Sequence, residues 1–280
     1  MKSIQRFLAV GLLGAASQLA IAQNYGDGTV CNIAGSADLT IAVASNFYYP
    51  AQAVAAIYQY DTGNVIKVCH NATGILKAAI ITDGANITPY DAFLAADNIA
   101  PGDLANVSGL TAAYHNSATF NYTKGIPVLW TPVSNVQLSA VISAPKVVYV
   151  ANPANAPYGV AAQTILNNAQ TGQYQDLVDE GQETSPVPPY AVVFSNIELT
   201  YQEVNNANSA TVVGFVAKSQ ICGRTGDSRI AYPSNPTTQD GVIINHPAKV
   251  SIATDFVDLL LDTPAQNILQ NSYCYLPRLP

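Results

Sequence analysis

Short apolar runs of strand length alternate with helical stretches along most of this chain. In the first part, LTIAVA (39–44), VIKVC (65–69) and AFLA (92–95) are such runs, and helical patterns over 50–60 and 74–81 separate them. Continuous apolar runs of this length are typical of strands that are buried on both faces. Strands that alternate with helices pair in parallel and carry the helices on the faces of the sheet. The sequence therefore predicts an α/β fold.

A second set of alternating elements follows a stretch over 101–124 that is rich in Asn, Ser, Thr and Gly. We expect Thr263 to be the N-cap of the last helix, with Pro264 as its first residue and Gln266 completing a capping box. Gly, Pro and Asn are scattered, so we expect two lobes joined by crossing strands and not by a flexible tether. The further expected strands are 146–151, 192–194, 212–216 and 242–245, and the further helices 160–168, 197–205 and 251–261.

The N-terminus has the pattern of an export signal. Lys2 and Arg6 precede an apolar run over 7–21, and Ala20-Ile21-Ala22 form a small-x-small cleavage site. This pattern predicts a secretory signal peptide over residues 1–22 and an exported mature protein. The alternative is a membrane anchor, but the run is short for a span of about 20 apolar residues.

An oxidising compartment gives the four cysteines a context. Cys31, Cys69, Cys222 and Cys274 allow three pairings into two disulfides, and we expect Cys31 with Cys69 and Cys222 with Cys274. The chain has no C-x-x-C and no H-x-x-x-H, which compact zinc sites use. We therefore expect structural disulfides and no metal site.

Composition excludes several classes of function. Only 10% of the residues are charged, against about 25% in a typical domain, and the net charge is −7, so a nucleic-acid binder is not expected. The usual hydrolase, zinc and nucleotide motifs are missing, so we name no catalytic residue, no cofactor and no nucleophile–base pair. His70, His115 and His246 are expected to be surface or loop residues.

Two hydroxyl residues follow neighbouring strands at the points where helices begin. Ser45 comes after the first strand and Thr73 after the second. In open α/β sheets ligands bind at the carboxyl ends of the strands, and helix N-termini offer free N–H groups that suit an anion. The alternative is that both side chains only cap their helices. The sequence thus predicts an anion site, with capping as the competing explanation.

Seven segments, in this order and spacing, resemble the periplasmic molybdate-binding proteins of ABC importers, a family with the type 2 periplasmic binding protein fold. The resemblance covers nearly all of 39–277. It is carried by LTIAVAS (39–45), NATGIL (71–76), YDAFLAAD (90–97), ANPANAPYG (151–159), SNI (195–197), VGFVAKSQI (213–221) and FVDLLLDTPAQNIL (256–269).

The resemblance implies a two-lobed α/β fold, in which each lobe is a mixed, mostly parallel sheet flanked by helices. Residues 38–124 and 222–280 would form lobe I, and residues 125–221 lobe II. The family binds its oxyanion in the cleft between the lobes with neutral donors: two hydroxyls from one lobe, and backbone N–H groups and a Tyr hydroxyl from the other.

Carried over by position, the two hydroxyls are those of Ser45 and Thr73, and the N–H donors belong to Tyr158 and Ile197. The family's Tyr is Ala217 here, so one hydroxyl is lost. Tyr158 stands where the family usually has Ala, and Asn46 where it usually has an apolar residue. Either the Tyr158 ring enters the space beside Ala217 and restores a hydroxyl, or the pocket is rebuilt for another ligand.

The resemblance implies a binding protein and not an enzyme: a periplasmic solute-binding protein that carries a small oxyanion such as molybdate or tungstate, or a related small anion, to an ABC permease. We expect it to be a monomer. Donors without an acceptor would favour a fully deprotonated oxyanion over protonated phosphate. A secreted binding or adhesion protein that keeps this fold without a transport role remains the alternative, and an extracellular hydrolase is a third hypothesis.

Overall fold

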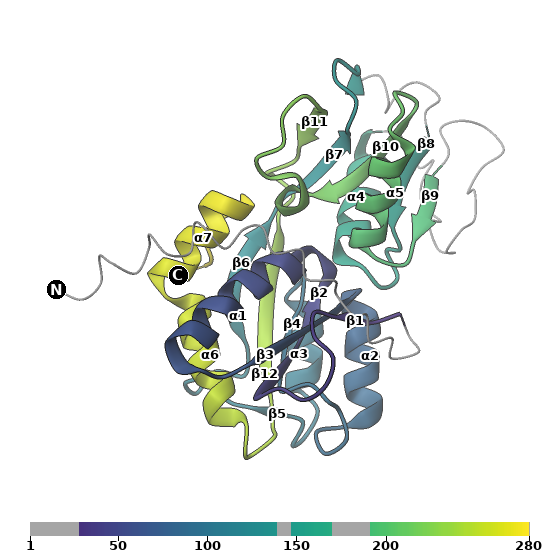
Figure 1. The fold of residues 1–280 in the computed structure, drawn as a ribbon. Coiled ribbons are helices and arrows are strands. Elements are labelled where there is room, and N and C mark those ends of the chain that lie inside the picture. Colours follow the sequence, from purple (N-terminus) through teal and green to yellow (C-terminus); the bar gives the residue numbers. More distant parts are fainter. Residues whose placement is uncertain (1–27, 139–146, 170–190, 280) are drawn as a thin grey trace.

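The computed structural model describes residues 28–138, 147–169 and 191–279, and the expected signal peptide over 1–22 lies outside them. Within these residues the chain forms two sheets, each with helices on both faces (Figure 1). In the described part of the chain, no helix is both long and apolar enough to cross a membrane. The predicted mixed α/β fold is confirmed.

The first sheet contains the N-terminal and C-terminal parts of the described chain. Strands β2, β3 and β4 are parallel, β1 is antiparallel to β3, and β12 is antiparallel to β4, β5 and β6. The order across the sheet is β1-β3-β2-β4-β12-β5, with β6 also paired to β12. Its strands are β1 (Val30–Cys31), β2 (Leu39–Ala44), β3 (Ile66–Asn71), β4 (Ala92–Leu94), β5 (Thr111–Ala112), β6 (Phe120–Gly125) and β12 (Thr237–Ile244).

Side chains that alternate along β2 fill two separate cores, because successive residues of a strand point to opposite faces of the sheet. Ile41 and Val43 pack in one buried cluster with residues of α1, α6 and α7, whereas Ala42 packs in another with residues of α2 and α3. Both faces of the strand are therefore apolar. The helices are α1 (Tyr48–Thr62), α2 (Thr73–Asp83), α3 (Ile99–Ala105), α6 (Val250–Leu261) and α7 (Thr263–Tyr273).

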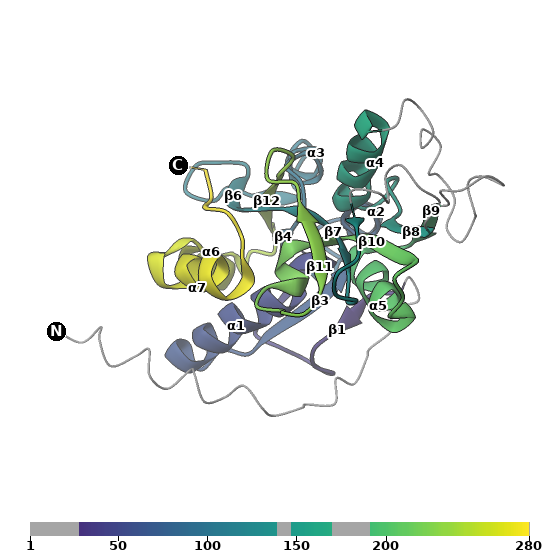
Figure 2. The same ribbon diagram turned by 90° about the horizontal axis from the view of Figure 1, so that it is seen from above.

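The second sheet has the order β11-β7-β10-β8-β9. Strands β8, β9 and β10 are parallel, and β7 is antiparallel to β10 and β11. Side chains of α4 and α5 belong to separate buried clusters, and the two helices cover opposite faces of this sheet (Figure 2). The elements are β7 (Pro127–Thr131), β8 (Val147–Ala151), α4 (Pro157–Ala169), β9 (Ala191–Phe194), α5 (Ile197–Ala207), β10 (Val212–Ala217) and β11 (Ser228–Ala231).

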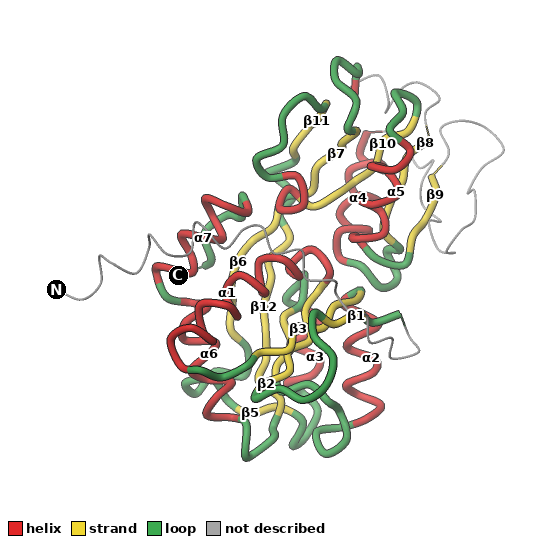
Figure 3. The backbone as a smooth tube through the Cα atoms, in the orientation of Figure 1, coloured by secondary structure: helices red, strands yellow, loops and turns green. Residues whose placement is uncertain are grey.

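Two connections cross between the sheets, from β6 to β7 and from β11 to β12 (Figure 3). They are joined by a hydrogen bond from Tyr232 N to Pro127 O at 3.0 Å. Lys218 N, at the start of the short helix η4 (Lys218–Ile221) that follows β10, donates to Ile126 O in the first connection at 2.9 Å. Since β11 pairs with β7, residues 228–231 belong to the second sheet, whereas the sequence assigned all of 222–280 to lobe I.

The sequence predicts β2, β3, β4, β8, β9 and β10 from their apolar runs, and it misses β6 and β7. β6 carries Asn121, Thr123 and Lys124, which break the apolar pattern, whereas β7 is apolar and buried but begins with a proline. The cap of α7 was also wrong by one residue. A side-chain oxygen of Asp262 accepts a hydrogen bond from Thr263 N at 2.7 Å, so Asp262 is the N-cap and Thr263 the first helical residue.

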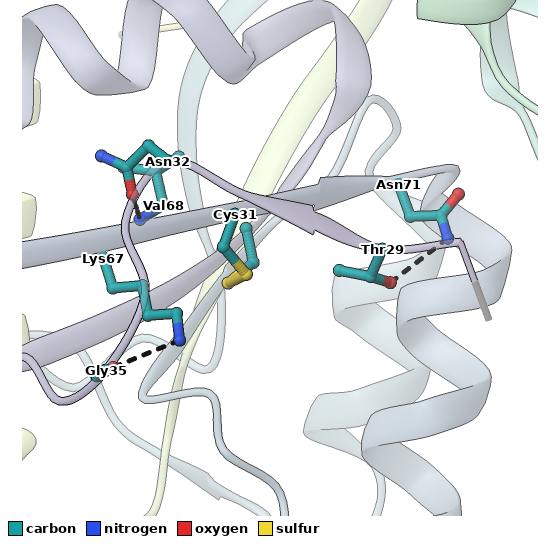
Figure 4. Close-up of a disulfide and its surroundings, with 8 residues drawn as sticks. Thr29, Cys31, Asn32, Gly35, Lys67, Val68 and Asn71 are labelled. Carbon is teal, nitrogen blue, oxygen red and sulfur yellow. Dashed lines mark hydrogen bonds between the residues drawn. A yellow bond between two sulfur atoms is a disulfide. The ribbon is translucent and has the colours of Figure 1, made fainter. Parts of the chain in front are cut away.

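Both expected disulfides are present. Cys31–Cys69 joins β1 to β3, where the two residues are direct partners in the antiparallel ladder (Figure 4). The same edge is held by hydrogen bonds from Asn71 Nδ2 to Thr29 Oγ1 at 3.2 Å and from Lys67 Nζ to Gly35 O at 3.3 Å. Cys222–Cys274 links the end of η4, which lies between β10 and β11 of the second sheet, to the end of α7 of the first lobe.

Removal of the Cys31–Cys69 disulfide tests how much this bridge contributes to the free energy of unfolding. The bridge spans a sequence separation of 38 residues, so the double variant Cys31→Ala/Cys69→Ala should lower the free energy of unfolding by about 2–4 kcal/mol. Urea unfolding of the two proteins under oxidising conditions measures this difference. A loss below about 1 kcal/mol would mean that the ladder and its hydrogen bonds hold β1 without the bridge.

Candidate functional site

A small pocket lies where four helices begin, two from each lobe. Its volume is about 190 Å³, including its open mouth. The pocket is placed at the carboxyl ends of β2, β3 and β4 in the first sheet and of β8 and β9 in the second. It is lined by Ala44, Ser45, Asn46, Ala72, Thr73, Ala96, Ala156, Pro157, Tyr158 and Ile197.

The two hydroxyl residues of the first lobe do not cap their own helices. Ser45 is the first residue of the short helix η2 (Ser45–Phe47) and Thr73 the first of α2, and the N-cap residues are alanines. Ser45 Oγ lies 3.1 Å from His70 Nδ1, and Thr73 Oγ1 accepts a hydrogen bond from Ala96 N at 3.1 Å. Capping therefore does not account for these side chains, and both line the pocket.

The second lobe contributes backbone N–H groups. Asn196 caps α5 by accepting hydrogen bonds from Glu198 N and Leu199 N, both at 3.0 Å. This leaves the N–H of Ile197, the first residue of α5, with no acceptor among the described residues. The N–H of Tyr158, which follows Pro157 at the start of α4, also has no acceptor among the described residues. Two unpaired donors thus occur at this side of the pocket.

The pocket has no cationic side chain in its lining. Its positive potential comes from helix N-termini, which carry partial positive charge on their free N–H groups. A buried carboxylate, Glu198, lies one residue beyond Ile197, and burial raises its pKa. Gln220 and Gln202 donate to its two oxygens at 2.9 and 3.1 Å, so this carboxylate is fixed at the first turn of α5.

Asn46 is anchored by a polar network at the base of the pocket. Its Nδ2 donates to Gln239 Oε1 at 3.1 Å and to Tyr275 Oη at 3.0 Å, and its carbonyl oxygen accepts from Tyr275 Oη at 2.9 Å. Asn46 Oδ1 is buried without a hydrogen-bond partner among the described residues. Asn46, a residue of the pocket lining, thus carries a buried acceptor without a partner, whereas the sequence identified no acceptor there.

Tyr158 and Ala217 belong to one buried cluster with Ile197, and Ala217 itself does not line the pocket. The Tyr158 hydroxyl accepts a hydrogen bond from Gln239 Nε2 at 3.3 Å, and burial raises the pKa of this hydroxyl. The hydroxyl is therefore bonded to the crossing strand β12. That Tyr158 replaces the hydroxyl missing at Ala217 stays a prediction.

The sequence predicts His70 on the surface or in a loop, and this prediction is wrong. His70 lies in β3, is only 8% exposed, and its ring stacks on Tyr48 with 4.1 Å between ring centroids. Burial lowers its pKa from 6.5 to about 4, so the imidazole is neutral at neutral pH. Ser45 and His70 form a hydroxyl–imidazole pair, although the sequence pointed to no such pair.

The two lobes touch each other around the pocket. Gly74 N, in the first turn of α2, donates to Asn155 O of the second lobe at 2.8 Å. A Cβ at Gly74 would approach Asn155 Cα to 3.0 Å, so a side chain here would push Asn155 of the other lobe back by a few tenths of an ångström. On the other side, Ser219 Oγ donates to Asn46 O at 3.2 Å. These hydrogen bonds join the two lobes, so the lobes are closed around the pocket.

The structure brings Ser45, Asn46, Thr73, Tyr158 and Ile197 together around one pocket and leaves Ala217 outside its lining. Sequence reasoning missed three residues that support it: His70, Gln239 and Tyr275. For His70 the signal was present, since it directly follows the apolar run of β3. Gln239 and Tyr275 come from polar or irregular segments that carry no such signal.

Two lobes with a small pocket between them, lined by hydrogen-bond donors from both, are the architecture of a bilobal solute-binding protein. The chain belongs to the family of bacterial extracellular solute-binding proteins, which residues 39–273 match. This family consists of binding proteins and not of enzymes.

Relatives and solved structures agree with this assignment. The chain is 31% identical over 264 residues to the molybdate-binding protein ModA of Azotobacter vinelandii, covering 91% of this chain and 95% of the relative. It is 28% identical over 243 residues to ModA of Rhodobacter capsulatus, covering 85% and 88%.

The solved periplasmic molybdate-binding protein of Azotobacter vinelandii superposes with a TM-score of 0.69 at 22% identity, covering 86% of this chain and 99% of that one. Iron-bound HitA of Pseudomonas aeruginosa superposes with a TM-score of 0.55 at 16% identity, covering 85% and 86%. At these identities the two structures support the fold, and their different ligands mean that the fold alone does not define what is bound.

The buried histidine predicts a dependence of stability on pH. The folded-state pKa of His70, about 4, lies below its ordinary value of 6.5, so the unfolded chain binds more protons between these values. The contribution of neutral His70 is complete above pH 6.5 and is lost as the pH falls to about 4. Between pH 7 and pH 4.5, urea unfolding should show a loss about 2–3 kcal/mol larger for the wild type than for His70→Asn. Equal losses would contradict a buried neutral imidazole.

A substitution at Gly125 tests the packing of Tyr158 against the crossing strands. A Cβ at Gly125 would collide with the Tyr158 hydroxyl and would lie 2.5 Å from Gln239 Nε2. Gly125→Ala should therefore lower the free energy of unfolding by about 1–3 kcal/mol, as overpacking does. Gly102→Ala is the matched control, because no atom lies within 4 Å of its Cβ and helix α3 should gain up to about 1 kcal/mol. Equal effects of the two variants, measured by urea unfolding, would contradict this packing.

Proposed function

We propose that this protein is a periplasmic binding protein that captures a small oxyanion of the molybdate and tungstate kind and delivers it to an ABC permease. Two curated relatives named as molybdate-binding proteins support the ligand class. The predicted signal peptide supports the location. On this proposal the protein acts as a monomer with one ligand between its lobes.

The convergence of neutral donors from both lobes carries the proposal. Ser45 and Thr73 present hydroxyls from one side, and the N–H groups of Tyr158 and Ile197 lack acceptors on the other. Buried N–H groups normally have hydrogen-bond partners, and a group left without one costs about 1–3 kcal/mol. An anion with several oxygen atoms would satisfy these donors together, and the four helix N-termini would stabilise its charge.

The size of the pocket limits the ligand. The space inside it that water could occupy is only about 10 Å³, about the room for one water molecule, so only a ligand of a few heavy atoms is compatible with it and the lobes would have to part slightly to admit a tetrahedral oxyanion. The absence of Lys and Arg from the lining means that selection would rest on geometry and hydrogen bonds. The unpaired Asn46 Oδ1 could accept a hydrogen bond from the O–H of a protonated ligand, so protonated oxyanions belong in any test.

Closure of the lobes would couple binding to transport. The hydrogen bond from Gly74 N to Asn155 O joins the lobes beside the pocket, and the two crossing connections are the natural hinge. A ligand that bridges the lobes would favour the closed form, which the permease would recognise.

We propose a binding role rather than a catalytic one. Ser45 and His70 could be imagined as nucleophile and base, but a pKa of about 4 makes His70 a weak general base at neutral pH. A secreted adhesion protein would have a filled or collapsed cleft at Ser45, Thr73 and Tyr158. The space between these residues is small, so a binding measurement decides between the two functions.

Ligand binding to the purified mature protein tests the proposal. Molybdate, tungstate, sulfate and phosphate should be compared by thermal shift and calorimetric titration. Molybdate or tungstate should raise the unfolding temperature, because a ligand that binds only the folded state stabilises it. Ser45→Ala and Thr73→Ala should each weaken affinity about 10–100-fold, the usual effect of losing a hydrogen bond to a charged group.

Ser108→Ala is the control for these variants, since it removes an exposed hydroxyl away from the pocket. It should leave affinity unchanged. The proposal is wrong if the wild type responds to none of the four anions, or if Ser45→Ala and Thr73→Ala bind as tightly as Ser108→Ala.

A further inference from the structure

The hydroxyl of Ser45 has one described partner, and that partner is a buried imidazole. Ser45 Oγ lies 3.1 Å from His70 Nδ1. His70 is held in place from two directions: it belongs to β3, opposite Val30 of β1, and its ring stacks on Tyr48. The disulfide of the preceding residue, Cys69, further fixes this strand (Figure 4). The imidazole is therefore a rigid neighbour of a residue in the pocket lining.

A neutral imidazole has one N–H, and its position decides what Ser45 can offer. If Nδ1 is unprotonated, it accepts the single hydroxyl proton of Ser45, and only lone pairs of Ser45 remain for the pocket. If Nδ1 carries the proton, it donates to Ser45 Oγ, and the hydroxyl proton is free for a ligand. Burial keeps His70 neutral, so the choice between these two tautomers is real at neutral pH.

Thr73 shows which arrangement suits the pocket. Its Oγ1 accepts a hydrogen bond from Ala96 N at 3.1 Å, and a backbone N–H can only donate. One of the two lone pairs of the Thr73 hydroxyl is thereby occupied by the protein, and its hydroxyl proton is left for another acceptor. In the same way, a proton on His70 Nδ1 would donate to Ser45 Oγ and leave the hydroxyl proton of Ser45 for another acceptor. Both hydroxyls would then be donors towards the same pocket.

We propose that His70 is a positioning residue for anion binding: its Nδ1–H donates to Ser45 Oγ and so directs the single hydroxyl proton of Ser45 to the bound oxyanion. This inference rests on the proposed function, because it assigns a ligand with acceptor oxygens to the pocket. A bound oxyanion selects the Nδ1–H tautomer, since any other leaves an acceptor of Ser45 facing an acceptor of the ligand.

Variants of His70 separate this role from plain packing. His70→Leu removes the donor and should weaken affinity for molybdate, or for whichever of the four inorganic anions the wild type binds, about tenfold. His70→Asn keeps an N–H donor at the same distance along the side chain and should stay within about threefold of the wild type. In the Ser45→Ala background, His70→Leu should have no further effect on affinity, because its target is gone.

A spectroscopic measurement reports the proton itself. With histidines labelled by ¹⁵N, NMR of the wild type saturated with the anion should show Nδ1 of His70 protonated and Nε2 unprotonated. The His70→Asn spectrum assigns the signal. Urea unfolding of each variant without ligand identifies any that fail to fold, and His70→Asn preserves the test if His70→Leu does not fold.

The proposal is overturned if Nδ1 is unprotonated in the complex, or if His70→Leu weakens binding equally with and without Ser45. It is also overturned if His70→Asn binds as poorly as Ser45→Ala. Each of these results leaves the oxyanion-binding function standing, since the wild type still binds. If the wild type binds none of molybdate, tungstate, sulfate and phosphate, the proposed function fails first and this role fails with it.

Discussion

A helix leaves its first N–H groups without acceptors, and this constraint organises the site. Here η2 and α2 of the first lobe and α4 and α5 of the second all begin around one pocket. In the described structure the N–H groups of Tyr158 and Ile197 have no partner from the protein. Four helix ends that face one small space produce a positive potential without any Lys or Arg. A chain with few charges and a net charge of −7 can therefore still present a site suited to an anion.

The arrangement of these helix ends depends on the crossing strands. Gln239 of β12 is fully buried and bonds to Asn46 of one lobe and to Tyr158 of the other. Gly125 of β6 makes room for the Tyr158 hydroxyl beside it. The segment that joins the lobes thus also supports the pocket, so changes in hinge geometry and changes in the site are coupled. The buried polar network restricts how the lobes meet, because each of its groups needs its partner.

Much of the fold could be predicted from the sequence, because strands buried on both faces leave continuous apolar runs. LTIAVA of β2 is the clearest case, with Ile41 and Ala42 serving different cores. The missed strand β6 has polar residues such as Asn121 on its accessible side, and β11 was placed in the wrong lobe because strand pairing between distant segments leaves no local pattern.

For the site, the sequence identified Ser45 and Thr73 from their places after strands, and the family resemblance added Tyr158, Asn46 and Ile197. The structure gathers all five around one pocket. The partners behind them, Gln239 and Tyr275, come together only through the tertiary fold, and a single sequence cannot show this. His70 was assigned to the surface since histidine usually has a polar environment, yet its position in β3 buries it.

The central claim is that a small oxyanion is held between the lobes by neutral donors alone. A crystal structure of the mature protein with molybdate, using anomalous scattering at the molybdenum edge, tests this most directly. The account predicts one strong peak between Ser45, Thr73, Tyr158 and Ile197, within hydrogen-bond distance of both hydroxyls and both N–H groups. A peak at a Lys or Arg elsewhere on the protein, or no peak at saturating molybdate, would contradict it.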